Sequence, residues 1–146
     1  MGAIAASLAI TTPNVAHTTE EASPKQSVLT TEHFTTPSGK IQCQVTIDDL
    51  RCEFSSGQLL RPAPRRPQNC DLDWGSGLVL GHSGSVEVLC AGDTIRLPRD
   101  HSTTLAYGRT WKRGSFTCKV QRVGLTCTNG SRRGFFLSTQ RWRAIN

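Results

Sequence analysis

Apolar and polar residues alternate along residues 115–129 (SFTCKVQRVGLTCTN), which predicts two short strands joined by a tight turn. Cys118 shares the apolar face of the first strand, and Cys127 shares that of the second. Residues 40–54 (KIQCQVTIDDLRCEF) follow the same pattern near the start of the domain. Because successive side chains of a strand point to opposite faces, each stretch predicts a β-hairpin with one buried and one polar face.

The cysteine spacing is the same in both predicted hairpins, with eight residues between the two cysteines. In a hairpin with a two-residue loop, opposed residues differ by an odd number of positions, so Cys43 can oppose Cys52 and Cys118 can oppose Cys127. Cross-strand neighbours on one face lie close enough for a disulfide. The matched spacing indicates an internal repeat, and two unrelated hairpins with ordinary strand patterning are the alternative.

Six cysteines in a small polar chain indicate a disulfide framework. Six allow fifteen connectivities, and the hairpins together with sequence proximity favour Cys43–Cys52, Cys70–Cys90 and Cys118–Cys127. Hydrophobic residues make up 36% of the 146 residues, and the mean hydropathy is -0.33. Such a chain needs covalent links because it buries little apolar surface. Zinc is the rival interpretation, but no two cysteines have the close spacing of structural zinc sites, so no metal or other cofactor is expected.

Three segments divide the chain. Residues 1–16 begin with small and apolar residues that are typical of the core of a secretory signal peptide, although a basic start is missing, which a start codon assigned too far downstream would explain. Residues 17–32 have the composition of a disordered linker, and residues 33–146 form the predicted domain. The alternative is a cytosolic protein with a disordered tail, against which the six cysteines weigh. No stretch is long and apolar enough for a transmembrane helix.

The remaining pattern predicts further short strands and little helix. Residues 61–69 (RPAPRRPQN) are a surface connector, and residues 86–97 predict two strands around a turn at positions 91–93. Residues 133–138 predict a last strand, and residues 139–146 one helical turn capped by Ser138. The large aromatic residues in these segments, Trp74, Phe135, Phe136 and Trp142, are expected in the core or at its edge. The predicted fold class is a small antiparallel all-β domain built from disulfide-linked hairpins.

Several of these stretches, read in order, carry a resemblance. TPSGKIQC, LRCEF, CDLDWGSGL, VLCAGDT, YGRTW, FTCKVQRVGLTCTN and GFFLS are similar to a family of small exported proteins of actinobacteria and cyanobacteria, which is known as a domain of unknown function. The match spans about residues 34–143. It implies an exported domain with paired cysteines and no assigned activity. Members of that family often have a Gly-His pair before the final GFF stretch, where this chain has Arg132 and Arg133, so no role of that histidine transfers.

Catalytic residue patterns are weak in this chain. The hypothesis of a small envelope hydrolase depends on Asp71, Asp73, Asp93 and His82, which would have to converge in one pocket. The stretch GHSGS around His82 departs from the nucleophile elbow in its last position, and the chain is too short for the usual hydrolase fold. Asp71 and Asp73 do not continue into a calcium-binding loop. The sequence therefore favours a protein that is not an enzyme.

Positive charge is concentrated late in the chain. Residues 95–146 contain eleven Lys or Arg residues and one acidic residue, whereas the preceding residues contain six against ten. A basic surface with Trp111 and Trp142 among its residues would attract anions, and an ordinary solvated face is the alternative. The nine residues expected to form this surface are Arg109, Lys112, Arg113, Lys119, Arg122, Arg132, Arg133, Arg141 and Arg143. All except Lys119 and Arg122 make up the candidate anion-binding set.

These observations predict a secreted or envelope-associated domain that binds rather than catalyses. Its expected partner is an anionic polymer of the bacterial cell envelope or an acidic protein. Nucleic acid is not expected, because no RNA-recognition signature, zinc finger or basic helix is present.

Overall fold

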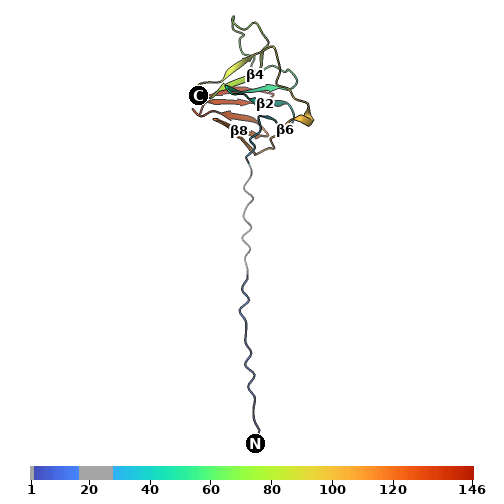
Figure 1. Ribbon diagram of the computed structural model, residues 1–146, viewed down its shortest axis with the longest axis vertical. Coiled ribbons are helices and arrows are strands. Elements are labelled where there is room, and N and C mark those ends of the chain that lie inside the picture. Colours follow the sequence, from blue (N-terminus) through green and yellow to red (C-terminus); the bar gives the residue numbers. More distant parts are fainter. Residues whose placement is uncertain (1, 17–27) are drawn as a thin grey trace.

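A computed structural model describes residues 2–16 and 28–146, of which the latter form two β-sheets packed face to face (Figure 1). The predicted all-β fold class is confirmed. The first sheet contains, in spatial order, β5 (Glu87–Cys90), β4 (Trp74–Gly81), β3 (Asp49–Phe54), β2 (Ile41–Val45), β1 (His33–Thr35) and β6 (Thr103–Thr104). The second contains β11 (Trp142–Ile145), β10 (Gly134–Leu137), β9 (Gly124–Thr128), β8 (Phe116–Gln121) and β7 (Thr110–Arg113). The described residues contain one helix, the 3-10 turn η1 (Arg99–His101). No helix among them is long and apolar enough to span a membrane.

The same meander occurs twice in the chain. Strands β1 to β5 follow one another across the first sheet, strands β7 to β11 do so across the second, and a disulfide joins the second and third strand of each. The next strand of each meander places a glycine, Gly77 or Gly134, beside the second cysteine of that disulfide. A Cβ added to either glycine would meet the carbonyl oxygen of Cys52 or Cys127. The internal repeat indicated by the cysteine spacing is therefore present in the structure, since both meanders place the disulfide and the glycine at the same positions.

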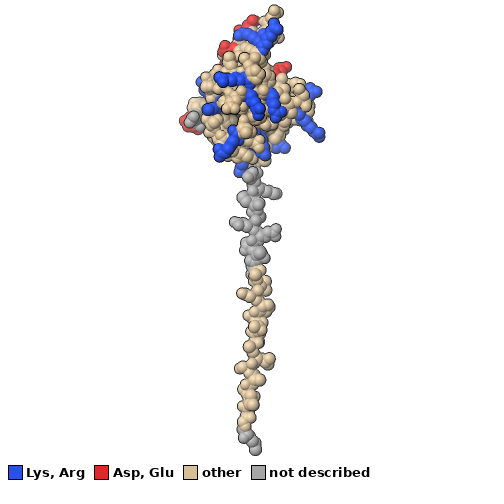
Figure 2. All heavy atoms as spheres, turned by 180° about the vertical axis from the view of Figure 1, so that it is seen from behind, with Lys and Arg blue, Asp and Glu red and all other residues tan. Residues whose placement is uncertain are grey.

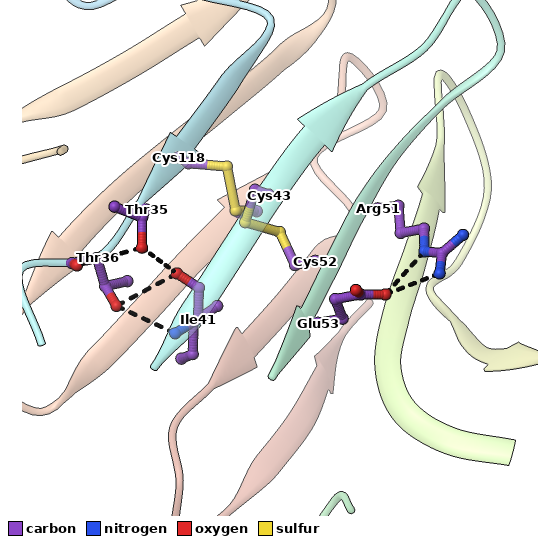
Figure 3. Close-up of a disulfide and its surroundings, with 9 residues drawn as sticks. Thr35, Thr36, Ile41, Cys43, Arg51, Cys52, Glu53 and Cys118 are labelled. Carbon is purple, nitrogen blue, oxygen red and sulfur yellow. Dashed lines mark hydrogen bonds and ion pairs between the residues drawn. A yellow bond between two sulfur atoms is a disulfide. The ribbon is translucent and has the colours of Figure 1, made fainter. Parts of the chain in front are cut away.

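Disulfides occupy the centre of the core. The bonds Cys43–Cys52 and Cys118–Cys127 each link directly opposed residues whose Cα atoms are 4.1 Å apart, and all four side chains are fully buried. Three of the four sulfur atoms lie within 4.8 Å of one another, and Figure 3 shows the two bonds meeting between the sheets. The two sheets therefore contact each other through sulfur at this point.

The third disulfide and the proline-rich connector lie at the margin of the sandwich. Cys70 and Cys90 join the segment before β4 to the end of β5, as the sequence favoured. The indole of Trp74 donates a 3.0 Å hydrogen bond to the carbonyl of Pro64, and that of Trp142 donates one of 3.0 Å to the carbonyl of Pro62. These bonds fix a connector that has few backbone donors of its own.

Residues 93–97, called the strap below, cross the outer face of the first sheet. The strap is held by side chains: the backbone N–H of Ile95 donates to the carboxylate of Glu53 at 2.9 Å, and the N–H of Leu97 donates to the side-chain oxygen of Gln42 at 2.9 Å. Glu53 also accepts from Arg51 at 2.8 Å and from the hydroxyl of Thr94 (the Arg51 contact is drawn in Figure 3). The buried carboxylate is thus fully paired.

Two sequence predictions are wrong in this part of the fold. Residues 86–97 contain one strand rather than two, because the backbone donors of the strap bond to side chains of the first sheet instead of a neighbouring strand. Residues 139–146 form no helical turn; Trp142–Ile145 is strand β11, paired with β10. Ser138 still acts locally, since its hydroxyl accepts from the N–H groups of Gln140 and Arg141.

The predicted boundary at residue 16 lies at the edge of residues 17–27, which are outside the described part of the chain, whereas the boundary at residue 32 lies within the described part. Residues 28–32 of the predicted linker lie along β7. Leu29 forms a parallel bridge with Trp111, and the indole N–H of Trp111 donates a 2.7 Å hydrogen bond to the carbonyl of Thr31. Residues 2–16 are exposed and have no secondary structure.

A buried histidine lies beside the strap. His33 is 8% exposed, and among the described residues neither ring nitrogen has a hydrogen-bond partner of good geometry. Burial lowers the pKa of His33 because it disfavours the charged imidazolium, and the nearby Gln42 side chain and Ile95 backbone oppose this effect only in part.

The domain is therefore expected to lose stability as the pH falls from about 7.5 to about 5. In this range the unfolded chain binds a proton at the ordinary histidine pKa of about 6.5, whereas folded His33 binds one only at lower pH, so acid favours unfolding. Denaturant titrations at both pH values measure the loss, and His33→Gln should reduce it. His101→Gln, which changes an exposed histidine of η1, is the control, and an equal reduction by both variants would contradict this role of His33.

Candidate functional site

A partly enclosed cavity of about 530 Å³ lies at one end of the sandwich, where turns from both sheets meet. The β1–β2 turn, the β8–β9 turn and the β10–β11 turn form its walls, and Tyr107 closes one side. The lining residues are Thr36, Ser38, Lys40, Ile41, Tyr107, Val120, Gln121, Arg122, Val123, Gly124, Leu125, Ser138, Thr139, Gln140 and Arg141. The cavity thus lies between the two halves of the internal repeat.

The chemistry of the lining is cationic. Lys40, Arg122 and Arg141 come from three different turns, and among residues 2–16 and 28–146 no aspartate, glutamate or histidine lines the cavity. Among the described residues none of the three forms an ion pair with a carboxylate within 4.0 Å. Hydroxyl and amide groups supply most of the other polar atoms, over a floor of aliphatic side chains. Such a lining favours a ligand that carries negative charge together with hydrogen-bonding groups.

Short-range hydrogen bonds shape the walls. The hydroxyl of Thr36 contacts both the N–H and the carbonyl of Ile41, which closes the β1–β2 turn (Figure 3). The hydroxyl of Ser138 does the same for the β10–β11 turn by accepting from the N–H of Arg141 at 3.1 Å. Serine and threonine form such turns readily because their hydroxyls reach backbone groups two to five residues away.

Aromatic rings hold two of the cations. The guanidinium of Arg122 lies over the ring of Tyr107 at 4.9 Å from the ring centre, and that of Arg141 lies over Phe136 at 5.5 Å. Gly124 lets the β8–β9 turn pack closely on β10, because a Cβ there would meet the Phe136 ring at 2.6 Å. These contacts limit the conformations of both arginines before any ligand binds.

The outer face of the second sheet is also basic. Because Trp111, Cys118 and Cys127 point into the core, their strand neighbours point outward. The outward residues of these strands with positive charge, together with Arg141 of the adjoining β10–β11 turn, are named the basic face: Lys112, Lys119, Arg143 and Arg141. All four are exposed, and none of the strands β7 to β11 contains an acidic residue. Figure 2 shows one side of the domain on which basic side chains dominate the surface and acidic ones lie near its margins.

The structure divides the predicted anion-binding set. Lys112, Arg141 and Arg143 belong to the basic face, and Arg141 and Arg143 both lie over the Phe136 ring. The other four residues lie elsewhere: Arg109 in the turn before β7, Arg113 in an ion pair with Glu32 at 2.9 Å, and Arg132 and Arg133 in the β9–β10 turn at the far end of β9 from the cavity. The prediction that Trp111 belongs to this surface is wrong, because it is fully buried.

Sequence reasoning left Arg122 out of the candidate anion-binding set and singled out neither Lys40 nor Tyr107 as a site residue. Lys40 precedes the first hairpin in the half of the chain where acidic residues are more numerous, and Tyr107 has the pattern of a bend. No sequence signal links either residue to the basic C-terminal half, because the link depends on how the two sheets pack.

The hydrolase hypothesis required Asp71, Asp73, Asp93 and His82 to converge, and the structure does not bring the histidine to the acids. Asp71 and Asp73 precede β4, whereas His82 follows its other end. The hydrogen bond from Arg51 lowers the pKa of Asp93, so this carboxyl is an ion-pair partner rather than a proton donor. None of the four lines the cavity.

His82 and Ser115 form a hydrogen-bonded pair of the kind found in catalytic sites, but here the pair connects turns of the two sheets. Its Nδ1 lies 2.6 Å from the hydroxyl of Ser115, and its Nε2 lies 2.9 Å from the carbonyl of Ile47. The ring stacks on Phe116, with the ring centres 4.8 Å apart. These contacts connect three turns at the end of the sandwich opposite the cavity. Neither His82 nor Ser115 lines a cavity in the described part of the chain.

The sulfur cluster offers no metal ligand in the oxidised protein. Cys43, Cys52 and Cys127 lie close enough to share an ion. All six cysteines, however, form disulfides, and a thiolate is required to bind a metal.

The fold and the cavity together define a small β-sandwich that is held by three disulfides and carries a cationic cavity. The model of a family of unknown function, DUF6636, matches residues 20–144, and the chain belongs to this family. Comparison with curated proteins found no match, and comparison with solved structures found none either.

Proposed function

We propose that this protein is an exported, non-catalytic binding domain that attaches to an anionic polymer of the bacterial cell envelope through its basic face. The observation that carries the proposal is the absence of acidic residues from strands β7 to β11, whose outward side carries Lys112, Lys119 and Arg143, with Arg141 in the β10–β11 turn beside them. Residues that are exposed and of one sign attract a polyanion and are not neutralised by their own neighbours.

Export is supported by the cysteines and by the start of the chain. Three disulfides in a domain of this size are typical of oxidising compartments. We propose residues 1–16 as the signal peptide, residues 17–32 as a linker whose last residues, 28–32, lie along β7, and residues 33–146 as the disulfide-rich β domain.

The charge arrangement favours binding to a polymer over binding to a single ion. Each exposed lysine or arginine contributes little alone, because water and salt screen its charge over about 8 Å at physiological ionic strength. Several such charges on one sheet face can act together when a chain of anions lies across them and releases its counterions. The interaction should therefore weaken steeply with salt.

Chromatography on immobilised polygalacturonate, a carboxylated polysaccharide, tests this proposal. The oxidised domain should be retained, and Lys112→Gln/Lys119→Gln should elute at clearly lower salt because both changes remove charge from the basic face. Arg132→Gln/Arg133→Gln removes the same charge from the β9–β10 turn and is the matched control, with a smaller shift expected. Failure to bind, or equal shifts for both variants, would show that the basic face has no special role.

A further inference from the structure

We infer that the cavity at the end of the sandwich binds a carboxylated sugar unit of two or three residues. This inference rests on the proposed function, since the anionic polymer held by the basic face would supply the unit. Arg141 belongs both to the basic face and to the cavity lining, so a polymer that lies across the basic face can reach into the cavity.

The positive charge of the cavity is the first reason. Lys40, Arg122 and Arg141 face a partly enclosed space, and in the described part of the chain no acidic side chain lines it. Two of the three are arginines, whose planar donor fork fits a carboxylate with two parallel hydrogen bonds. The aromatic rings of Tyr107 and Phe136 contact these guanidinium groups and limit their motion before binding, which reduces the side-chain entropy lost when a ligand binds.

The mixture of hydroxyl, amide and aliphatic groups is the second reason. Ser38, Thr139 and Gln140 can exchange hydrogen bonds with sugar hydroxyls, while the exposed side chains of Val123 and Tyr107 offer an apolar surface to the C–H face of a sugar ring. A lipid chain would leave the polar groups unpaired, and an inorganic anion would leave most of the space unused.

The size of the cavity is the third reason. Its volume of about 530 Å³ lies within the range of about 300–1,000 Å³ that is typical of sites for small organic ligands. A phosphate or sulfate ion fills a small part of this volume, whereas a short oligosaccharide can contact all three turns. The cavity therefore fits the carboxylate and the sugar hydroxyls of one ligand at the same time.

Calorimetric titration of the oxidised full-length chain tests the inference with trigalacturonate as the probe. Binding is expected for trigalacturonate and not for neutral maltotriose. Arg122→Gln and Lys40→Gln should each weaken binding about tenfold or more, as is usual when a charged hydrogen bond is lost. Arg132→Gln/Arg133→Gln, in the β9–β10 turn outside both the cavity and the basic face, should leave trigalacturonate binding unchanged. Thermal melts of each variant identify any that fails to fold, and the two single cavity variants serve as independent tests.

The outcomes separate this inference from the proposed function. Retention on polygalacturonate without binding of trigalacturonate, or binding that neither cavity variant weakens, would overturn the cavity site and leave the basic face intact. Equal affinity for inorganic phosphate would show a site for a small anion instead of a sugar. Polymer retention that Lys112→Gln/Lys119→Gln does not weaken, together with intact trigalacturonate binding, would contradict the proposed role of the basic face alone.

Discussion

Trp111→Ala is expected to destabilise the domain by about 3–5 kcal/mol, the range found when large aromatic side chains are removed from protein cores. Trp111 is fully buried, lies opposite Cys118 in the second sheet and contacts the ring of Phe34 from the first sheet, with ring centres 5.0 Å apart. Its removal leaves a cavity between the sheets and leaves the carbonyl of Thr31 without its indole donor. Denaturant titration followed by circular dichroism measures the loss.

Trp142→Ala is the matched control for this prediction. Trp142 lies on the edge strand β11, is partly buried and bonds to the carbonyl of Pro62. Its removal opens no enclosed cavity and should cost about 1–2 kcal/mol, close to the cost of one lost hydrogen bond and partial burial. Equal losses for the two tryptophan variants would mean that the contact between the sheets is not where the structure places it.

Cys118→Ala/Cys127→Ala is expected to cost about 4 kcal/mol, more than Cys70→Ala/Cys90→Ala. Chain entropy alone favours the opposite order: the sequence separations of 9 and 20 make the second bond the more stabilising by about 0.7 kcal/mol. The first pair, however, is fully buried against the other central disulfide, and removing two sulfur atoms there forfeits about 2 kcal/mol of packing.

The comparison of these two double variants decides between two accounts of the disulfides. If the Cys70–Cys90 variant is the less stable one in thermal and denaturant unfolding, the bonds act mainly by limiting the unfolded chain. If the order is as expected here, the central disulfides act as core side chains, and the packing of the two sheets depends on them. The cavity would then depend on them as well, because its walls are turns of both sheets.

Local patterns in the sequence were enough for the hairpins. Alternation along residues 40–54 and 115–129 defines strands by side-chain direction alone, and the spacing of the cysteines sets which residues oppose each other. Neither inference needs knowledge of the rest of the chain. Residues 93–97 show the limit of this reasoning: they have the composition of a strand, yet their donors bond to Glu53 and Gln42, some forty to fifty-five positions away.

The candidate site shows the same limit in a different way. An excess of Lys and Arg in the last third of the chain was plain, and Lys112, Arg141 and Arg143 do share a face. A count of charged residues does not say which way their side chains point or at which end of a strand they lie. It therefore could not separate these residues from Arg132 and Arg133, which lie in the turn at the other end of β9 from the cavity. Which end of a strand a residue occupies matters as much as its charge.

The amino-acid sequence by itself determined the all-β class, the two central hairpins and the surplus of positive charge, because strand alternation and cysteine spacing are local properties. Only the tertiary structure decided that Trp111 is buried and that Lys40 lies beside Arg122 and Arg141. Those facts depend on how one meander packs on its repeat, and that packing is fixed by contacts between residues about seventy-five positions apart, such as Phe34 with Trp111 and Cys52 with Cys127.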